Sequence, residues 1–213
     1  MSNIINNQNL MMYAVRILVL LCCFPVHECA HAWMANKLGD PTGRLQGRIT
    51  LNPVKHLNLW GTITLLLCGV GYAKPVPVNI RNFRNEKRDF ALTSLAGPLS
   101  NLVMAVAFMA VFRMMYSIPG TASYVIRYFL YYGSYINISL AVFNLIPIPP
   151  LDGSRVLTAV LPDNAYHTVL RYEKYSMYIL LALLIVCNRM GFSPVSYLSG
   201  HLFNMLQTLF MIG

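Results

Sequence analysis

Residues 11–37 read MMYAVRILVLLCCFPVHECAHAWMANK, an apolar run that ends in ionisable side chains. Its first part, residues 11–25, contains a single charged side chain and is suited to a lipid environment. Its second part places His27, Glu28 and His31 at the end of the same apolar run. Ionisable groups at membrane depth cost several kcal/mol unless they are paired or bind a metal, so these three residues mark a functional site.

The composition indicates a membrane protein. Of the 213 residues, 56% are hydrophobic and 11% are charged, and the mean hydropathy is +0.53. Four apolar runs are long enough to cross a hydrocarbon core of roughly 30 Å, near residues 10–35, 90–117, 123–146 and 174–190. Residues 59–72 are too few to span and suit a re-entrant segment, while residues 195–212 could span or lie on the surface. We therefore expect an all-α polytopic membrane protein of about five to six transmembrane helices, forming one domain over residues 1–213.

The distribution of positive charge predicts the orientation in the membrane. The chain carries 16 Lys and Arg against 7 Asp and Glu, a net charge of +9 that would also suit nucleic-acid binding. With the N-terminus outside, however, twelve of the sixteen fall on the cytoplasmic side: Lys37, Arg44, Arg48, Lys55, Lys74, Arg81, Arg84, Lys87, Arg88, Arg155, Arg171 and Lys174. We expect a multi-pass protein of the cell membrane, with its active site toward the cytoplasm, lipid headgroups near residues 81–89 and no nucleic-acid partner.

The spacing of His27 and His31 is typical of a metal site. Positions i and i+4 of a helix differ by about 40° in azimuth and 6 Å in height, so both imidazoles can hold one ion. Glu28 flanks this site without chelating easily, which suits a general base that takes a proton from water activated by the metal. The alternative is that both histidines only form hydrogen bonds within a helix bundle. That arrangement would leave two imidazoles and a carboxylate at membrane depth without a common partner.

A catalytic zinc site needs a third protein ligand, and Asp152 is the candidate. It ends the segment NLIPIPPLDG at residues 144–153, whose prolines break the helix where backbone must line a polar cavity. In the predicted topology, His27 and Asp152 lie at the same depth. Taken alone, the PLDG sequence would equally suit a turn in which the aspartate caps a helix.

Five motifs together resemble those of one protein family. They are HECAH at 27–31, NPVKH at 52–56, GYAKPVPVN at 71–79, AGPLSN at 96–101 and NLIPIPPLDG at 144–153. Their order and rough spacing resemble the site-2 protease family of intramembrane zinc metalloproteases, in its compact bacterial type without a PDZ or CBS domain. The resemblance covers about residues 10–160, which we expect to form the catalytic core, with C-terminal helices over about 173–213.

The resemblance implies a zinc metalloendopeptidase that cleaves the transmembrane helix of a protein substrate. It implies one Zn²⁺ per chain, held by His27, His31 and Asp152, with Glu28 as the catalytic base. A substrate helix satisfies its own backbone hydrogen bonds, so local unwinding must precede attack on its amides. The substrate, the regulatory signal and the oligomeric state are left open by the sequence.

Three further positions match family residues of less certain role. Asn101 matches an asparagine near the active site that could stabilise the oxyanion, and Asn144 and His56 match possible accessory residues. An asparagine in a membrane helix is also commonly a hydrogen-bonding contact between helices. In relatives an acidic residue commonly follows the NPxxH motif by two positions, and this chain has Asn58 there.

Residues 41–60 resemble the family's re-entrant β-hairpin, whose edge could pair with an extended substrate. A polar cytoplasmic loop of the same length is the alternative.

The same side chains would also suit other functions. A metal transporter or metal-sensing membrane protein could use the His and Asp cluster as a transit site, but it would place further acidic or His residues along a pathway. A non-haem iron enzyme also uses two histidines and a carboxylate, but it has no necessary role for Glu28. An inactive relative that only binds helices is disfavoured because all four proposed catalytic side chains are intact.

Overall fold

The structure is a computed structural model that describes residues 2–58, 63, 74–191 and 193–211. In this part of the chain it consists of helices and short 3-10 turns, without a strand. The longer helices are α1 (Ser2–Lys37), α4 (Glu86–Met115), α5 (Thr121–Asn144), α7 (Asp163–Arg189) and α8 (Pro194–Leu209). The short elements are α2 (Thr42–Leu45), η1 (Pro53–Lys55), η2 (Ile80–Asn82) and α6 (Asp152–Ala159).

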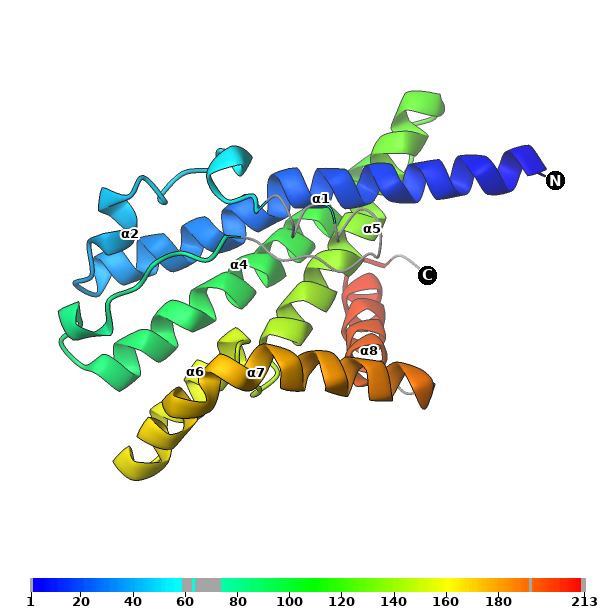
Figure 1. Cartoon of the computed structure of the whole chain (residues 1–213). Coiled ribbons are helices and arrows are strands. Elements are labelled where there is room, and N and C mark those ends of the chain that lie inside the picture. Colours follow the sequence, from blue (N-terminus) through cyan, green and yellow to red (C-terminus); the bar gives the residue numbers. More distant parts are fainter. Residues whose placement is uncertain (1, 59–62, 64–73, 192, 212–213) are drawn as a thin grey trace.

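Helix α4 lies at the centre of the bundle and contacts α1, α5 and α6, while α8 packs mainly on α5 (Figure 1). The end of α1 that carries the HECAH motif lies beside the first turns of α4, so these two helices run in opposite directions. Helix α6 packs against α4 at the same end of the bundle. The topology therefore brings residues from α1, α4 and α6 together.

Local sequence explains where the central helix begins. The side chain of Asn85 caps α4 by accepting a hydrogen bond from the Arg88 amide at 3.1 Å. Glu86 and Asp89 place negative charge in the first turn, where the helix dipole favours it. The N-cap residue and the first turn thus fix where α4 begins. They thereby fix the axial position of every side chain along the helix.

The central helices bury polar residues beside an apolar core and also expose large apolar residues on their outer faces. Asn101 of α4 and Asn137 of α5 are buried, and the Asn137 amide donates to the Gly133 carbonyl at 2.8 Å and to the Cys23 sulfur of α1 at 3.1 Å. In contrast, Val103 is 69% exposed and Met114 is 79% exposed on α4. Large apolar side chains on the outside of a helix bundle suit contact with lipid rather than with water.

Four of the predicted apolar runs coincide with the long helices α1, α4, α5 and α7, and residues 195–212 coincide largely with α8. Among the described residues, α4 is the one helix whose length and hydropathy both suffice to cross a membrane, and Tyr175–Cys187 is a shorter apolar stretch. The predicted re-entrant segment at 59–72 lies almost entirely outside the described residues.

The predicted β-hairpin at residues 41–60 is not confirmed. In the described part of this range, residues 42–45 form a helical turn and residues 53–55 form a 3-10 turn. The Asn52 side chain caps the second turn by accepting from the Val54 amide at 3.0 Å, and Pro53 at its first position lacks the amide hydrogen that a strand ladder needs. Turn-forming side chains therefore outweigh the β-branched residues of this segment.

Candidate metal centre

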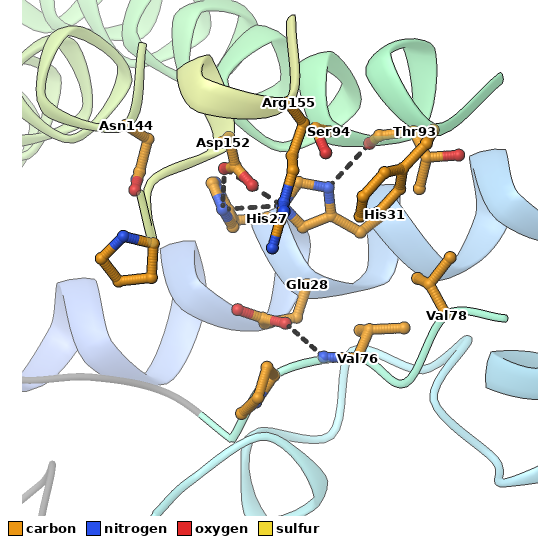
Figure 2. Close-up of a pocket in the computed structure, with 13 residues that line it drawn as sticks. His27, Glu28, His31, Val76, Val78, Thr93, Ser94, Asn144, Asp152 and Arg155 are labelled. Atoms are coloured by element: carbon orange, nitrogen blue, oxygen red, sulfur yellow. Dashed lines mark hydrogen bonds and ion pairs between the residues drawn. The ribbon is translucent and has the colours of Figure 1, made fainter. Parts of the chain in front are cut away.

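His27 and His31 project side by side from α1, as their spacing predicts. Their Nε2 atoms lie 3.0 Å apart, and both side chains are buried (Figure 2). Because the two residues are one helical turn apart on one continuous helix, no other element is needed to bring them together.

Asp152 completes the cluster from the opposite side. Its Oδ2 atom lies 3.4 Å from Nε2 of His27 and 3.4 Å from Nε2 of His31. Three atoms that bind a tetrahedral zinc at about 2.0–2.1 Å would lie about 3.3 Å from one another. The three donor atoms thus form a triangle of the right size for zinc, and the donor set of two imidazoles and one carboxylate suits a catalytic zinc site.

The break between α5 and α6 positions Asp152. Helix α5 ends at Asn144, and the proline-rich segment leads to Asp152 at the first turn of α6. Gly153 allows this turn to approach the end of α5, since a Cβ at this position would lie 2.2 Å from the Leu145 carbonyl oxygen. The Asp-Gly pair in PLDG therefore supplies both the carboxylate and the close approach that orients it.

Helix α4 supports the two imidazoles from behind. The Thr93 carbonyl oxygen accepts a hydrogen bond from Nδ1 of His31 at 2.8 Å, which leaves the lone pair of Nε2 directed at the cluster. Gly97 provides the space, because a Cβ there would lie 2.3 Å from Nε2 of His31 and 2.6 Å from Cε1 of His27. Pro98 follows and removes one helical hydrogen bond, which leaves the Ser94 carbonyl without its intrahelical donor.

Glu28 lies beside the cluster on the side of the cavity opposite Asp152. Its Oε2 atom accepts a hydrogen bond from the Val76 amide at 3.2 Å (Figure 2). The carboxylate is buried and lines the same cavity of about 270 Å³ as the three candidate ligands. The cavity is large enough for water and for part of a peptide, and Glu28 reaches it without being part of the metal cluster.

Residues 74–79 form the wall of the cavity next to Glu28. The buried Arg48 guanidinium donates to the carbonyl oxygens of Lys74 at 2.5 Å and Pro75 at 2.6 Å. At the other end, the Asp40 carboxylate accepts from the Asn79 amide at 2.8 Å. Two buried charged side chains therefore hold this segment in place against α1.

Asp40 is stabilised as a carboxylate by the same contacts. Burial alone would raise its pKa, but hydrogen bonds from the Thr42 hydroxyl, the Asn82 amide group and the Asn79 main chain outweigh burial and lower it. The charged form of Asp40 is therefore the form that holds the loop after α1 to residues 79 and 82.

The three less certain positions have different outcomes. Asn144 lines the cavity, whereas Asn101 is buried on α4 and does not line it. His56 also lies outside the cavity, and its Nε2 bonds to the Thr50 carbonyl oxygen at 2.8 Å. The oxyanion role of Asn101 and the accessory roles of Asn144 and His56 stay predictions.

Four contributors to the site were not identified from the sequence. Thr93 acts through a main-chain atom, which carries no sequence signal. Val76 reaches Glu28 across 48 residues of chain, and no periodicity predicts such a contact. Gly97 stands in the AGPLSN motif, and Arg155 stands one helical turn after Asp152, so these two could have been found by asking what surrounds the proposed ligands.

Comparison with known proteins identifies the family. The profile of "Peptidase family M50" matches residues 15–121 and 114–187. "Putative zinc metalloprotease YwhC" of Bacillus subtilis (strain 168) is 39% identical over 173 residues, which cover 79% of each chain. "Putative zinc metalloprotease MJ0611" of Methanocaldococcus jannaschii is 30% identical over 157 residues, 71% of this chain and 73% of that protein. "Putative zinc metalloprotease Rip2" of Mycolicibacterium smegmatis is 30% identical over 173 residues, 79% of this chain and 64% of that protein. No solved structure gives a significant match.

The profile covers most of the chain, and the relatives that are similar to the chain are named as putative zinc metalloproteases. The family resemblance based on five motifs is therefore confirmed, and so is zinc as the cofactor, for which the cluster of His27, His31 and Asp152 offers a site. The chain belongs to Peptidase family M50, the membrane-embedded site-2 proteases.

Proposed function

We propose that this protein is an intramembrane zinc metalloprotease that hydrolyses peptide bonds within or next to transmembrane helices of membrane-protein substrates. The single observation that carries the proposal is the convergence of His27, His31 and Asp152 on one point, with Glu28 beside them in a shared cavity. The buried polar residues of α4 and α5 and the large apolar side chains exposed on the same helices support a site enclosed by helices in lipid.

The metal ligands, Glu28 and the Val76 amide have different roles in the proposed reaction. His27, His31 and Asp152 hold the zinc, which when bound supplies a Lewis acid that polarises the scissile carbonyl and acidifies water. Glu28 takes the proton from the attacking water and later gives it to the leaving amine. The Val76 amide holds the Glu28 carboxylate on the side of the cavity opposite Asp152, so the base stays clear of the metal ligands.

A substrate helix must unwind before its amides can be attacked, and residues 74–79 offer an adjacent wall for the unwound chain. Pro75 and Pro77 lack amide hydrogens and restrict the residues before them to extended backbone. The segment is anchored at both ends by Arg48 and Asp40. These features suit a preformed surface for an extended substrate strand, which is the role that the sequence had suggested for residues 41–60.

We further propose a multi-pass arrangement in the cell membrane with the N-terminus outside and the site toward the cytoplasmic face, where lipid headgroups contact the basic loop. The charge distribution supports this orientation. The rival function, a metal transporter or sensor, gains no support: within the described residues, one cluster of His, Cys, Asp or Glu can hold a metal, whereas a transport path would need several.

The test is cleavage by purified protein reconstituted in liposomes with a panel of single-span substrates. Wild-type protein should cut at least one substrate, and Glu28→Gln should lower the rate by roughly 10²–10⁴-fold while zinc stays bound. Glu86→Gln, which removes an exposed carboxylate in the first turn of α4, is the matched control and should cut at the wild-type rate. Wild-type cleavage by zinc-loaded Glu28→Gln would contradict the assignment of the base.

A further inference from the structure

Arg155 is a cavity residue to which the proposed chemistry has given no role. It lies on α6 three positions after Asp152, so the two side chains share one face of the helix. Figure 2 shows its side chain running from α6 across the cavity toward Glu28. Its guanidinium carbon lies 5.0 Å from the centroid of the Phe90 ring on α4, a contact that fixes the direction of the side chain.

The charge of Arg155 is matched to the reaction. Among the described residues that line the cavity, it is the one permanent cation, and Glu28 and Asp152 are the carboxylates. With a divalent ion held by the ligands, the ion, the two carboxylates and the guanidinium leave a net charge of one positive unit. When water adds to the carbonyl and its proton passes to Glu28, the negative charge moves from that carboxylate to the former carbonyl oxygen, where a cation in the cavity can stabilise it.

The guanidinium also has the necessary hydrogen-bonding capacity. It carries five N–H donors, so bonds to neighbouring protein groups leave others that can reach a substrate. Asn101, the residue expected to stabilise the oxyanion, is buried on α4 and does not line the cavity. Position therefore favours Arg155 over Asn101 for contact with the reacting carbonyl.

We propose that Arg155 is a catalytic residue that donates a hydrogen bond to the scissile carbonyl oxygen as that oxygen becomes an anion; this inference rests on the proposed peptidase function. In the first step the water oxygen bonds to the carbonyl carbon, a water proton passes to Glu28, and the electron pair of the C=O bond moves to oxygen. In the second step that pair returns, the C–N bond breaks, and the proton on Glu28 passes to the leaving nitrogen. Arg155 keeps its protons throughout.

The first test is kinetic and uses the full chain in liposomes. Arg155→Met keeps a long apolar side chain against Phe90 but removes the charge and the donors. It should lower kcat by about 10²–10³-fold with the zinc content unchanged and KM changed by less than about threefold. Arg155→Lys keeps the charge but not the planar fork of donors, and its kcat should be about tenfold higher than that of Arg155→Met. Arg84→Met, an equal loss of charge at an exposed position outside the cavity, should match wild type.

The second test measures binding and does not require turnover. In a peptide phosphinate, a tetrahedral anion replaces the scissile amide, so its affinity reports stabilisation of the oxyanion. Arg155→Met should weaken phosphinate binding by about 10²-fold relative to Arg84→Met. Wild-type phosphinate affinity and kcat in zinc-loaded Arg155→Met would overturn the proposal.

Two other outcomes are equally decisive. Loss of zinc from both Arg155→Met and Arg155→Lys would show that Arg155 only supports the ligands, and would also overturn the proposal. If wild-type protein binds zinc and the phosphinate but cuts no member of the substrate panel, the proposed peptidase function fails. The role of Arg155 in anion binding is then still decided by the phosphinate affinities of the variants.

Discussion

The chemistry of His31 depends on one main-chain oxygen. A carbonyl oxygen can only accept, so the 2.8 Å contact with the Thr93 carbonyl requires Nδ1 of His31 to be protonated; in the neutral imidazole that binds a metal, Nε2 then carries the lone pair. The proline that follows Gly97 loosens the hydrogen bonding of α4 in the turn that carries Thr93 and Ser94. A feature of α4 thus prepares a donor atom on α1 for the metal.

Removal of either histidine should empty the metal site. His27→Ala or His31→Ala leaves two protein ligands, so each should lower the zinc content of purified protein from about one per chain to below about a tenth of that value. Asp152→Asn should weaken binding, because a neutral amide is a poorer zinc ligand than a carboxylate. Metal analysis after dialysis against a fixed free zinc concentration measures the effect.

The matched control for these variants is His201→Ala, which removes an exposed imidazole from α8. It should keep the wild-type zinc content. Near-full zinc retention in both His27→Ala and His31→Ala would contradict the assignment of the site.

The close packing of α1 on α4 sets the geometry of the ligands. Gly97→Ala would place a Cβ 2.3 Å from Nε2 of His31 and 2.6 Å from Cε1 of His27, and neither imidazole can yield without leaving the cluster. We expect zinc affinity to fall by about 10–100-fold, as for loss of other groups that orient metal ligands. Competition with a chelator of known zinc affinity measures the change.

The control is the equivalent change in a helix with open space. A Cβ at Gly200 of α8 would meet no heavy atom of the described chain within 4 Å, so Gly200→Ala should leave zinc affinity unchanged and stabilise α8 slightly. Equal zinc affinities for Gly97→Ala and Gly200→Ala would show that α4 does not constrain the imidazoles.

The loop after α1 should make stability depend on pH through Asp40. Its folded-state pKa lies below the ordinary value of 3.8, so the unfolded chain binds this proton more readily than the folded one. The stabilisation is therefore fully present above about pH 5 and is lost as pH falls through 3.8 and below. Asp40→Asn should lower the unfolding temperature in detergent at pH 7 by roughly 5–10 °C.

The pH series distinguishes a charge effect from a packing effect. The difference in unfolding temperature between Asp40→Asn and wild type should shrink as the pH is lowered from 5 to 3, whereas Glu86→Gln should show a small difference throughout. A difference for Asp40→Asn that stays constant over this range would mean that the carboxylate charge does not stabilise the loop.

The sequence predicts the elements that carry local signals. The spacing of His27 and His31 predicts their adjacent positions on α1, and the prolines before Asp152 predict the break between α5 and α6. Residues 41–60 were expected to form a hairpin because they resemble the re-entrant hairpin of the family, but the Asn52–Pro53 pair forms a capped turn. Contacts that join distant segments, such as that of Val76 with Glu28, depend on packing and have no local signal.

Helix α4 links the two ends of the bundle. Its 30 residues extend about 45 Å, more than the roughly 30 Å of a hydrocarbon core. Nine of the sixteen Lys and Arg residues lie between Lys37 and Arg88, before this helix or in its first turn, while Gly120 follows its other end. The site lies near the first end, since Thr93 stands two turns into α4. In the proposed membrane arrangement, the orientation of α4 therefore determines which side of the membrane supplies water to the cavity.

The orientation of α4 can be measured with fusions at its two ends. A tandem reporter, in which alkaline phosphatase is active outside and green fluorescent protein fluoresces inside, should read cytoplasmic after Arg84 and external near Gly120. The physical reason is the excess of Lys and Arg before α4, because segments rich in these residues stay on the cytoplasmic side, beside anionic lipid headgroups. Because each fusion carries both reporters, each serves as its own control for expression. The reverse pattern would place the zinc cluster toward the outer face and contradict the proposed cytoplasmic access to the cavity.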